Sequence, residues 1–582
     1  MSGTQEGATA GAGSRAALAV LVALVVFSPW PFGSVDLRTT QAITIISLAT
    51  ALGAFLHDGR REPLQTPRAL LWPLLGLWAL AVFQLIPLPE GLHRLIAPGT
   101  ASVWHPDAPA AAASLGDALR PISLHPEATR RSLAFGTGLL ALAMVAVPAL
   151  RERRLLLRAA VAIVTGGVLV AVYGLVARLV FTDKLYGVWS VPTITPFGPF
   201  VSKNHFAGYV ELTALLSLGL AAGLASEARH GPGALSWIES RRARWVVAAW
   251  GAAAILVIAV PVCLSRGGVV SLCAGLVAFA GLRLWSRRDA RLSPRRLLAL
   301  GVAAGLLLVA LVFVLPNEAR ARVLTLAGVT TDQSGSYRLA VWRDTLRLVG
   351  SSPWLGSGFG AYEDAIPRFK TAAGNLSVEH AESDHLELLA EGGLVAATLV
   401  VALVTFVLTR GLRGATGPSQ RLARGLVTGA MAGLIAIGVH STFDFNLRIP
   451  SNALVCAMLV AVVLSVTTDE TAVPVPRTAA LAVTLTLGAA LLTPWAASRM
   501  SAGPLLRAAR SGESSLRRAR LDVDVTSHLR RRPADAAAWL ALAWLRFPSS
   551  RDEASSLASW AVRLDPTNRA VRDARSRLSA QQ

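Results

Sequence analysis

Long apolar stretches alternate with short polar connectors along most of this chain. A helix rises 1.5 Å per residue, so about twenty apolar residues cross the hydrocarbon core of a bilayer. We predict about thirteen spans of this kind, near residues 16–33, 39–56, 69–88, 132–150, 155–179, 206–226, 245–264, 267–285, 298–316, 393–409, 426–445, 451–467 and 479–497. The first stretch follows Arg15 without a small-residue cleavage site, so we expect an uncleaved span. The predicted fold class is all-α, a polytopic integral membrane bundle of about 12–13 transmembrane helices.

The composition and the placement of charge agree with a membrane protein. Of 582 residues, 53% are hydrophobic and 16% are charged, against about 25% charged residues in an ordinary soluble domain. The net charge of +21 lies mostly in connectors, at 57–68, 151–154, 240–245, 286–296 and 410–425. With a cytoplasmic N-terminus all of them fall on the cytoplasmic side, as the positive-inside bias requires. The connectors lack the interleaved stacking aromatics of a single-strand binder, so we expect no nucleic-acid partner.

This orientation divides the chain into membrane and outer segments. We predict a disordered N-terminus over 1–14, a first membrane part over 15–316, a large outer loop over 317–392, a second membrane part over 393–497 and an outer helical tail over 498–582. In the loop, Leu339, Trp342, Leu346 and Val349 recur at helical spacing and predict an amphipathic helix.

The tail carries two short helical patterns, 533–547 and 551–568, with Trp539, Trp560 and Leu564 on packing faces. Together they resemble one tetratricopeptide repeat, which is about 34 residues long. One repeat cannot bury its own apolar face. Two interpretations stay open, a cap that packs within the chain and a docking site for polysaccharide-assembly proteins.

Polar residues at the outer ends of spans point to function, because a charge beside the bilayer is costly. Four groups stand out: Ser265 and Arg266 in a tight hairpin, Lys203, Asn204 and His205 before the sixth span, the stretch 380–394, and His440 with Asp444 after the eleventh. An arginine that only anchors a hairpin would more often lie on the cytoplasmic side. Several arginines and a candidate base suit an anionic substrate such as a lipid-linked diphosphate sugar, since a guanidinium binds two phosphate oxygens at once.

The stretch HAESDHLELLAEGGL at 380–394 holds two histidines and four carboxylates at the start of a predicted span. Asp384 and Glu387 fit a capping box that starts a helix. A metal site is an alternative for the remaining groups, but clustered aspartates of a phosphate-metal site are absent. No zinc spacing involves the three cysteines, so we expect neither a metal nor a cofactor.

Five motifs together resemble the O-antigen ligase and polymerase superfamily of bacterial envelope glycosyltransferases. In chain order they are KNHFAGY at 203–209, SRGG at 265–268, the segment 337–362, the segment 380–394 and HSTFDFNLRIPSNA at 440–453. The resemblance implies a metal-independent, GT-C-like transferase of the bacterial inner membrane. Its donor would be a glycan on undecaprenyl diphosphate, presented at the periplasmic face, and its acceptor a glycan or a lipid A core sugar.

The resemblance also implies roles for single residues. Arg266 and Arg338 match arginines of the family that hold the diphosphate, and we add Lys203 to this group. We expect the further substrate contacts to come from Asn204, His205, Arg343, His440 and Asp444. The catalytic group is predicted to be His380, Glu382, Asp384 and His385.

The identity of the catalytic base is open at this point. Members of the superfamily commonly read A-H-N-D-Y-L where this chain reads AESDHL, so Glu382 stands in the place of the histidine. Either His380 supplies the imidazole, or Glu382 is itself the general base. We favour His380, with Glu382 orienting it or sharing the proton.

Other functions fit the sequence less well. A transporter or flippase for a lipid-linked or anionic solute would be expected to show internal repeats and helices broken near the midplane. A scaffold would leave the arginines and the histidine loop unexplained. Within the leading interpretation the residues do not decide between ligase and polymerase, although the helical tail slightly favours a polymerase.

Overall fold

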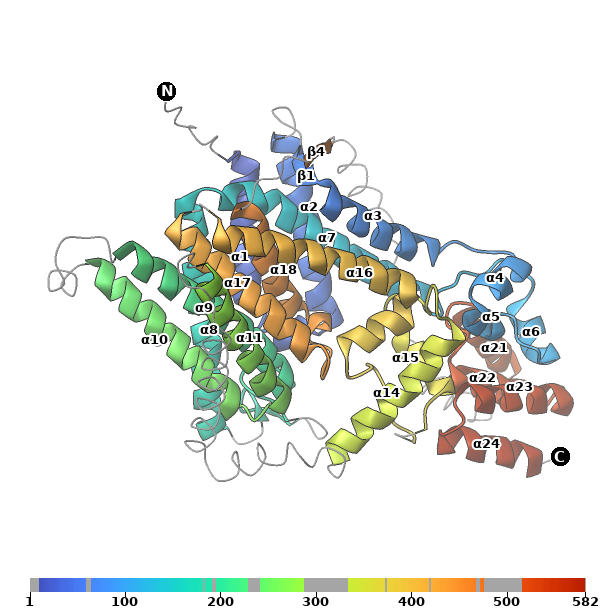
Figure 1. The fold of residues 1–582 in the computed structure, drawn as a ribbon. Coiled ribbons are helices and arrows are strands. Elements are labelled where there is room, and N and C mark those ends of the chain that lie inside the picture. Colours follow the sequence, from blue (N-terminus) through green and yellow to red (C-terminus); the bar gives the residue numbers. More distant parts are fainter. Residues whose placement is uncertain are drawn as a thin grey trace. The chain divides into compact units, whose positions relative to one another are not determined.

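The structure is a computed structural model, and it describes residues 10–58, 64–181, 184–190, 195–228, 241–286, 333–371, 374–417, 420–466, 472–475 and 515–580. The chain is all-α, as predicted, and Figure 1 shows its helices. The only strands among the described residues form two short antiparallel pairs, β1 (Leu64–Pro67) with β4 (Ala472–Val475) and β2 (Lys184–Leu185) with β3 (Trp189–Ser190).

The predicted spans coincide with apolar helices wherever the structure describes the chain. These helices are α1 (Ala12–Phe27), α2 (Leu37–Asp58), α3 (Arg68–Phe83), α7 (Pro126–Leu150), α8 (Arg153–Val180), α9 (Lys203–Ala228), α10 (Arg241–Val262), α11 (Arg266–Trp285), α16 (Asp384–Thr416), α17 (Arg421–His440) and α18 (Pro450–Val466). Eight of the described helices are long and apolar enough to cross a membrane, and α1, α3 and α18 are shorter. The predicted spans 298–316 and 479–497 lie outside the described residues. The first helix begins at Ala12, inside the predicted N-terminal segment 1–14.

Contacts divide the chain into two compact units. Unit 1 comprises 1–71, 135–328 and 403–486, and unit 2 comprises 72–134, 329–402 and 487–582. The helices α3, α7 and α16 contribute residues to both.

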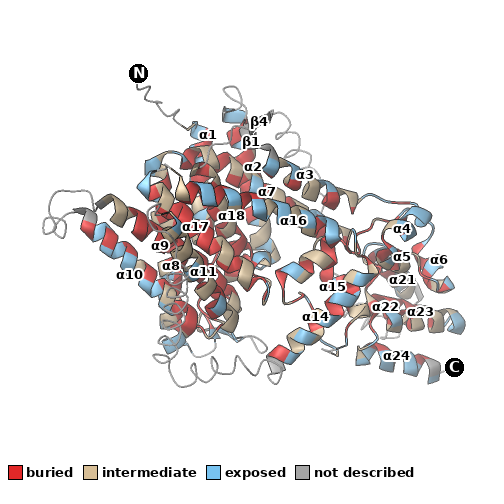
Figure 2. Cartoon of the chain, in the orientation of Figure 1, coloured by how far each residue is buried: buried red, intermediate tan, exposed pale blue. Residues whose placement is uncertain are grey.

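Helix α9 forms the centre of unit 1 and packs against α8, α10, α11, α17 and α18. In the most apolar part of α9, 94% of the residues are buried, whereas the corresponding share is 39% in α10 and 28% in α11. Figure 2 shows the difference, with pale blue exposed residues along α10. Large apolar side chains such as Trp245, Val247 and Ile258 are exposed on α10. A helix that presents such residues outward suits a lipid surrounding.

Glycines bring α9 and α17 into close contact. Gly219 and Gly223 on α9 face Gly425 and Gly429 on α17, with four-residue spacing on both helices. A Cβ added at Gly219 would lie 2.5 Å from the Gly425 carbonyl oxygen, and one at Gly429 would lie 2.4 Å from that of Leu215. Small residues at this spacing let helix backbones approach closely in membranes.

The two ends of unit 1 differ in chemistry. At one end Arg15 pairs with Glu152 at 3.0 Å, and Arg153 pairs with Glu227 at 2.6 Å. The starts of α1 and α8 and the end of α9 therefore meet there. The start of α9 and the turns that follow α10 and α17 gather at the opposite end, together with η1 (Phe32–Ser34) and η4 (Asn446–Arg448).

Unit 2 is built from short helices around a core of its own. These are α4 (Glu90–Ile96), α5 (Pro98–Trp104), α6 (Pro109–Leu115), α14 (Gln333–Ser351), α15 (Tyr362–Ala365), η3 (Ile366–Arg368), α21 (Ser515–Leu529), α22 (Ala536–Arg546), α23 (Arg551–Leu564) and α24 (Arg569–Ala580). Asp535 caps the start of α22 and Ser550 that of α23, each accepting a bond from a backbone N–H of the first turn. Helix α14 forms where the sequence predicts an amphipathic helix, and two of the predicted apolar residues, Leu339 and Leu346, are exposed.

The tail packs within unit 2. Trp539, Leu542 and Leu557 are fully buried in one cluster with Trp104 and Val341. Arg532 binds Asp364, and Lys370 pairs with Asp565 at 3.2 Å. The apolar face of the tail is therefore covered by this chain itself, which supports the interpretation of a cap. The resemblance to a tetratricopeptide repeat stays a prediction.

A glycine breaks α16 where its polar start becomes an apolar span. Gly393 has φ 65°, in the left-handed region, and a Cβ there would lie 2.3 Å from the Trp354 carbonyl oxygen. The N–H groups of Leu394 and Val395 donate to the carbonyls of Pro353 at 2.8 Å and Trp354 at 3.2 Å. The segment 384–392 is thus a separate short helix, held by the 353–361 loop.

Candidate functional site

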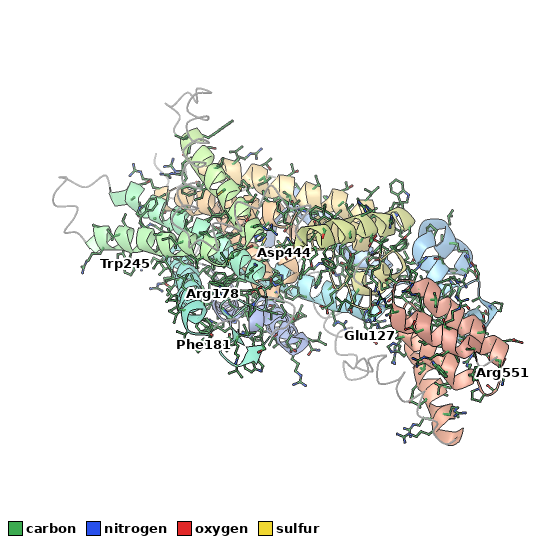
Figure 3. The ribbon with its side chains drawn as sticks, turned by 90° about the horizontal axis from the view of Figure 1, so that it is seen from below. Glu127, Arg178, Phe181, Trp245, Asp444 and Arg551 are labelled. Carbon is green, nitrogen blue, oxygen red and sulfur yellow. The ribbon has the colours of Figure 1, made fainter. Side chains whose placement is uncertain are left out.

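Three segments of unit 1 bring polar side chains together at one end of the bundle. They are the start of α9, the turn between α10 and α11, and the connection from α17 to α18. Asn204 donates its amide hydrogen to Asp444 and accepts a bond from the Ser265 hydroxyl at 2.8 Å. Asp444 is 2% exposed, and its other oxygen lies 3.4 Å from Nε2 of His205. In Figure 3 Asp444 lies among the helices of unit 1.

A second layer of contacts lies deeper in unit 1. Glu211 is fully buried on α9. One of its oxygens is 3.1 Å from Nδ1 of His440, and the other accepts a hydrogen bond from Ser271 on α11. A buried carboxylate is costly unless it is hydrogen-bonded or paired, and this one has both kinds of partner.

Arg266 is the first residue of α11 and stands between these two layers. Ser265 caps the helix by accepting from the Gly268 N–H at 3.1 Å. Next to Arg266, Gly267 leaves room for His440, because a Cβ there would lie 3.2 Å from Nε2 of the imidazole. Unit 1 therefore holds Lys203, Asn204, His205, Arg266, His440 and Asp444 of the predicted site.

Unit 2 holds the other predicted residues, namely Arg338, Arg343, His380, Glu382, Asp384 and His385. Arg338 on α14 pairs with Glu382, with Nε 3.2 Å from the carboxylate. Glu382 has φ 53°, a conformation that a glutamate adopts only when its surroundings impose it. The Trp342 indole N–H donates to the backbone carbonyl of Glu382 at 3.3 Å. Burial raises the pKa of Tyr337, and the charges of Glu382 and Glu379 raise it further.

The imidazole of His380 is oriented by Glu387, although the sequence points to Glu382 for this role. Its Nδ1 lies 3.0 Å from one oxygen of Glu387, and the other oxygen accepts from the Ala381 N–H at 3.0 Å. Glu387 is 1% exposed. Glu382 itself has a left-handed backbone and pairs with Arg338.

The predicted capping box differs in the same way. Helix α16 begins at Asp384, so Ser383 is the residue before it, and its hydroxyl accepts from the Leu386 N–H at 3.5 Å. Glu387 reaches back past the helix start to His380 and Ala381. Asp384 is buried, whereas His385 is exposed. Arg343 is exposed on α14.

Two contacts that position side chains of the candidate site, Ser271 with Glu211 and Glu387 with His380, are not predicted from the sequence. Ser271 lies in an apolar span with no local signal, and only the tertiary fold brings it to Glu211. The sequence pattern assigns Glu387 to a capping box with Asp384, so it gives no sign of the contact between Glu387 and His380. Among the described residues no group of three or more histidines, cysteines and carboxylates is arranged to hold a metal ion.

Residues 251–401 match the family model described as O-antigen ligase. This segment is therefore similar to the O-antigen ligase family. It carries Arg266, Arg338, His380 and Glu382, and it confirms the resemblance to the O-antigen ligase and polymerase superfamily. The match supports a role of the O-antigen ligase type in surface glycan assembly by a multi-pass membrane protein. No curated protein matches the chain.

Proposed function

We propose that this protein is an inverting glycosyltransferase that moves a glycan from undecaprenyl diphosphate to an acceptor hydroxyl at the periplasmic face of the inner membrane. The observation that carries the proposal is the match of 251–401 to the O-antigen ligase family model, because this one segment contains both arginines and the histidine loop. In the reaction the acceptor oxygen bonds to the anomeric carbon, and the bond from that carbon to the diphosphate breaks. Undecaprenyl diphosphate leaves, and the acceptor hydroxyl gives up its proton.

Arg266 and Arg338 are proposed to bind the diphosphate, with Lys203 as a third cation. Negative charge grows on the leaving diphosphate in the transition state. Fixed guanidinium groups stabilise that charge without reorganising. Since no other positive centre is required for this step, the proposed reaction is independent of metal ions and of cofactors.

His380 is proposed as the general base. Its Nδ1 is engaged by the buried Glu387 at 3.0 Å, so Nε2 is the nitrogen that accepts a proton. The side chain of His380 is 30% exposed, which lets an acceptor approach. Glu382 suits this role less well, because taking up a proton would break its ion pair with Arg338.

The remaining predicted residues take supporting roles in this proposal. Asn204 and Asp444 are hydrogen-bonded to each other beside Ser265, and Nε2 of His205 lies 3.4 Å from Asp444. These three residues are proposed to contact the donor. Arg343 and His385 are exposed and are proposed to contact the glycan. Asp384 is the first residue of α16 and is proposed to belong to the catalytic group.

The proposal that the site faces the periplasm rests on the arginine-rich connectors, because the fold alone does not give the orientation in the membrane. If the connectors rich in arginine are cytoplasmic, the end of unit 1 that holds Asn204 and Arg266 is periplasmic. The acceptor is a lipid A core sugar in a ligase and the end of another lipid-linked repeat unit in a polymerase.

A deletion strain tests the proposal directly. Its surface polysaccharides, separated on a gel, are expected to lose long chains while single repeat units stay attached if the protein is a polymerase. Lipid-linked polymer that accumulates without reaching the core identifies a ligase. Unchanged polysaccharides would contradict both. Purified protein treated with EDTA should keep its transfer activity, and loss of activity that Mg²⁺ or Mn²⁺ restores would overturn the metal-free mechanism.

A further inference from the structure

The turn that carries Arg266 is fixed from the side of α9. Ser265, one residue before it, caps α11 and donates to Asn204 at 2.8 Å. Leu264 has φ 62°, a left-handed conformation that a leucine keeps only when its surroundings impose it. This strained turn therefore has a defined geometry before any ligand arrives.

One buried carboxylate supports the same turn from beneath. Glu211 binds Ser271, five residues after Arg266 on α11, and His440 on α17. The imidazole of His440 in turn packs against Gly267, the residue after the arginine. Through these two side chains Glu211 connects the start of α11 to both α9 and α17.

An ordinary packing role does not require this carboxylate. A few turns further along α9, Gly219 and Gly425 hold the same two helices together without any charge. Replacing a buried ionic group by apolar residues is often neutral for stability, so such a group is better explained where directional contacts matter. The directional contacts of Glu211 lead to the arginine turn.

We infer that Glu211 is a positioning residue for Arg266, and that it acts through Ser271 and His440. The inference rests on the proposed function, in which Arg266 binds the diphosphate. A pre-organised turn lowers the entropy that is lost when the guanidinium is ordered around a phosphate. Its removal should weaken binding of the diphosphate and leave the rest of the bundle folded.

Binding of undecaprenyl diphosphate to the full chain in detergent tests this inference. Glu211→Ala is expected to raise the dissociation constant about 10-fold. Glu211→Gln should stay within about 3-fold of the unchanged protein, because the amide oxygen can accept from Ser271 and the amide nitrogen can donate to Nδ1 of the other His440 tautomer. The matched control is Ser217→Ala. Ser217 is buried on α9 and bonds to the Ala249 carbonyl at 3.1 Å, far along the helix from the turn.

The double variant separates positioning from general damage. In the Arg266→Ala background, Glu211→Ala should cause no further loss of binding, because the group that it positions is gone. Equal losses in both backgrounds, or a Glu211→Ala protein that binds normally, would overturn the inference while leaving the proposed function intact. Should Glu211→Ala not reach the membrane, Ser271→Ala takes its place, with an expected loss of about 3-fold. An unchanged protein that does not bind undecaprenyl diphosphate at all would overturn the proposed function, and the inference with it.

Discussion

Both units pair a histidine with a carboxylate, but they do so at different depths. In unit 1 the side chains of His440 and Glu211 are 1% and 0% exposed. In unit 2 the side chain of Glu387 is only 2% exposed, whereas the imidazole of His380 is 30% exposed. The same chemistry therefore has two uses. A pair that is buried on both sides can act only by positioning its neighbours, as we infer for Glu211 and the Arg266 turn, whereas a pair with one exposed member can also meet a substrate.

The arginines follow the same division. Arg266 stands on a turn with a fixed backbone and a capped helix start. Arg338 lies on the surface of α14, where its side chain is 25% exposed and already paired with Glu382. A phosphate that binds Arg338 must compete with that carboxylate. In the proposed reaction, Arg266 would therefore be ready to bind the diphosphate, whereas Arg338 would first have to release Glu382.

Removing either arginine tests this comparison with the largest expected effect. Arg266→Ala and Arg338→Ala should each lower kcat/KM for glycan transfer about 10²- to 10⁴-fold, because two charge-assisted hydrogen bonds of about 1.5–3 kcal/mol are lost. Lysine at either position should restore only part of the activity, since it cannot bind two oxygens in a fork. Transfer by purified variants, with insertion checked by membrane fractionation, measures the effect.

Matched arginines on the same helices serve as controls. Arg283 lies in the last turn of α11, and Arg347 on α14 is 51% exposed. Alanine at Arg283 or Arg347 should leave transfer near its normal rate. Full activity in Arg266→Ala or Arg338→Ala would count against the diphosphate site.

The histidine loop gives the next largest effect and identifies the base. His380→Ala should lower kcat about 10²-fold, the lower end of general base catalysis. Glu387→Ala should lower it about 10-fold and shift the pH–rate profile, because the imidazole loses its orienting partner. Glu382→Gln should leave kcat within about 5-fold of its normal value, since it only weakens the ion pair that competes with the diphosphate for Arg338. A large loss in Glu382→Gln, with little change in His380→Ala, would assign the base to Glu382 instead.

Much of this architecture is predictable from the sequence, because apolar length alone determines where a helix can span a bilayer. The amphipathic pattern of 337–350 likewise predicts α14. The contact of Asn204 with Ser265 and Asp444 is consistent with the prediction that these span ends lie on one side of the membrane. The match of 251–401 to the O-antigen ligase family model confirms the resemblance that the motifs indicate.

The contacts between side chains are less predictable. A pattern of the form D-x-x-E suggests a cap at Asp384, but a left-handed residue two positions earlier redirects the chain and gives Glu387 to His380. The Gly219 and Gly429 contact depends on which helices become neighbours, which local periodicity does not specify. The tail could be read as a docking module only because the residues that cover it, such as Trp104 and Val341, lie far away in sequence.

A third comparison lies within unit 2, where the tail is held by an ion pair between the buried Asp364 and the partly exposed Arg532. Asp364 accepts two bonds from Arg532, at 2.8 Å and 3.0 Å, and lies 2.8 Å from Nδ1 of His125. Burial alone would raise the pKa of this carboxyl. The bond from His125 and the charges of His125 and Arg532 outweigh it, so the pKa of Asp364 is lowered.

Breaking this tie should give the smallest effect and change stability more than catalysis. Arg532→Ala should destabilise unit 2 by about 2 kcal/mol near neutral pH. A lowered pKa in the folded state means that the carboxylate stabilises the fold above its ordinary pKa of 3.8 and that this stabilisation is lost as the pH falls. The difference between the two proteins should therefore shrink on acidification below that value. Thermal unfolding of the full chain in detergent, followed by tryptophan fluorescence across pH, measures it.

Arg531→Ala is the control, since Arg531 is adjacent and exposed. A difference that is equal at pH 7 and pH 3, or an Arg531→Ala protein that is destabilised as much, would show that the Asp364 pair does not hold the tail.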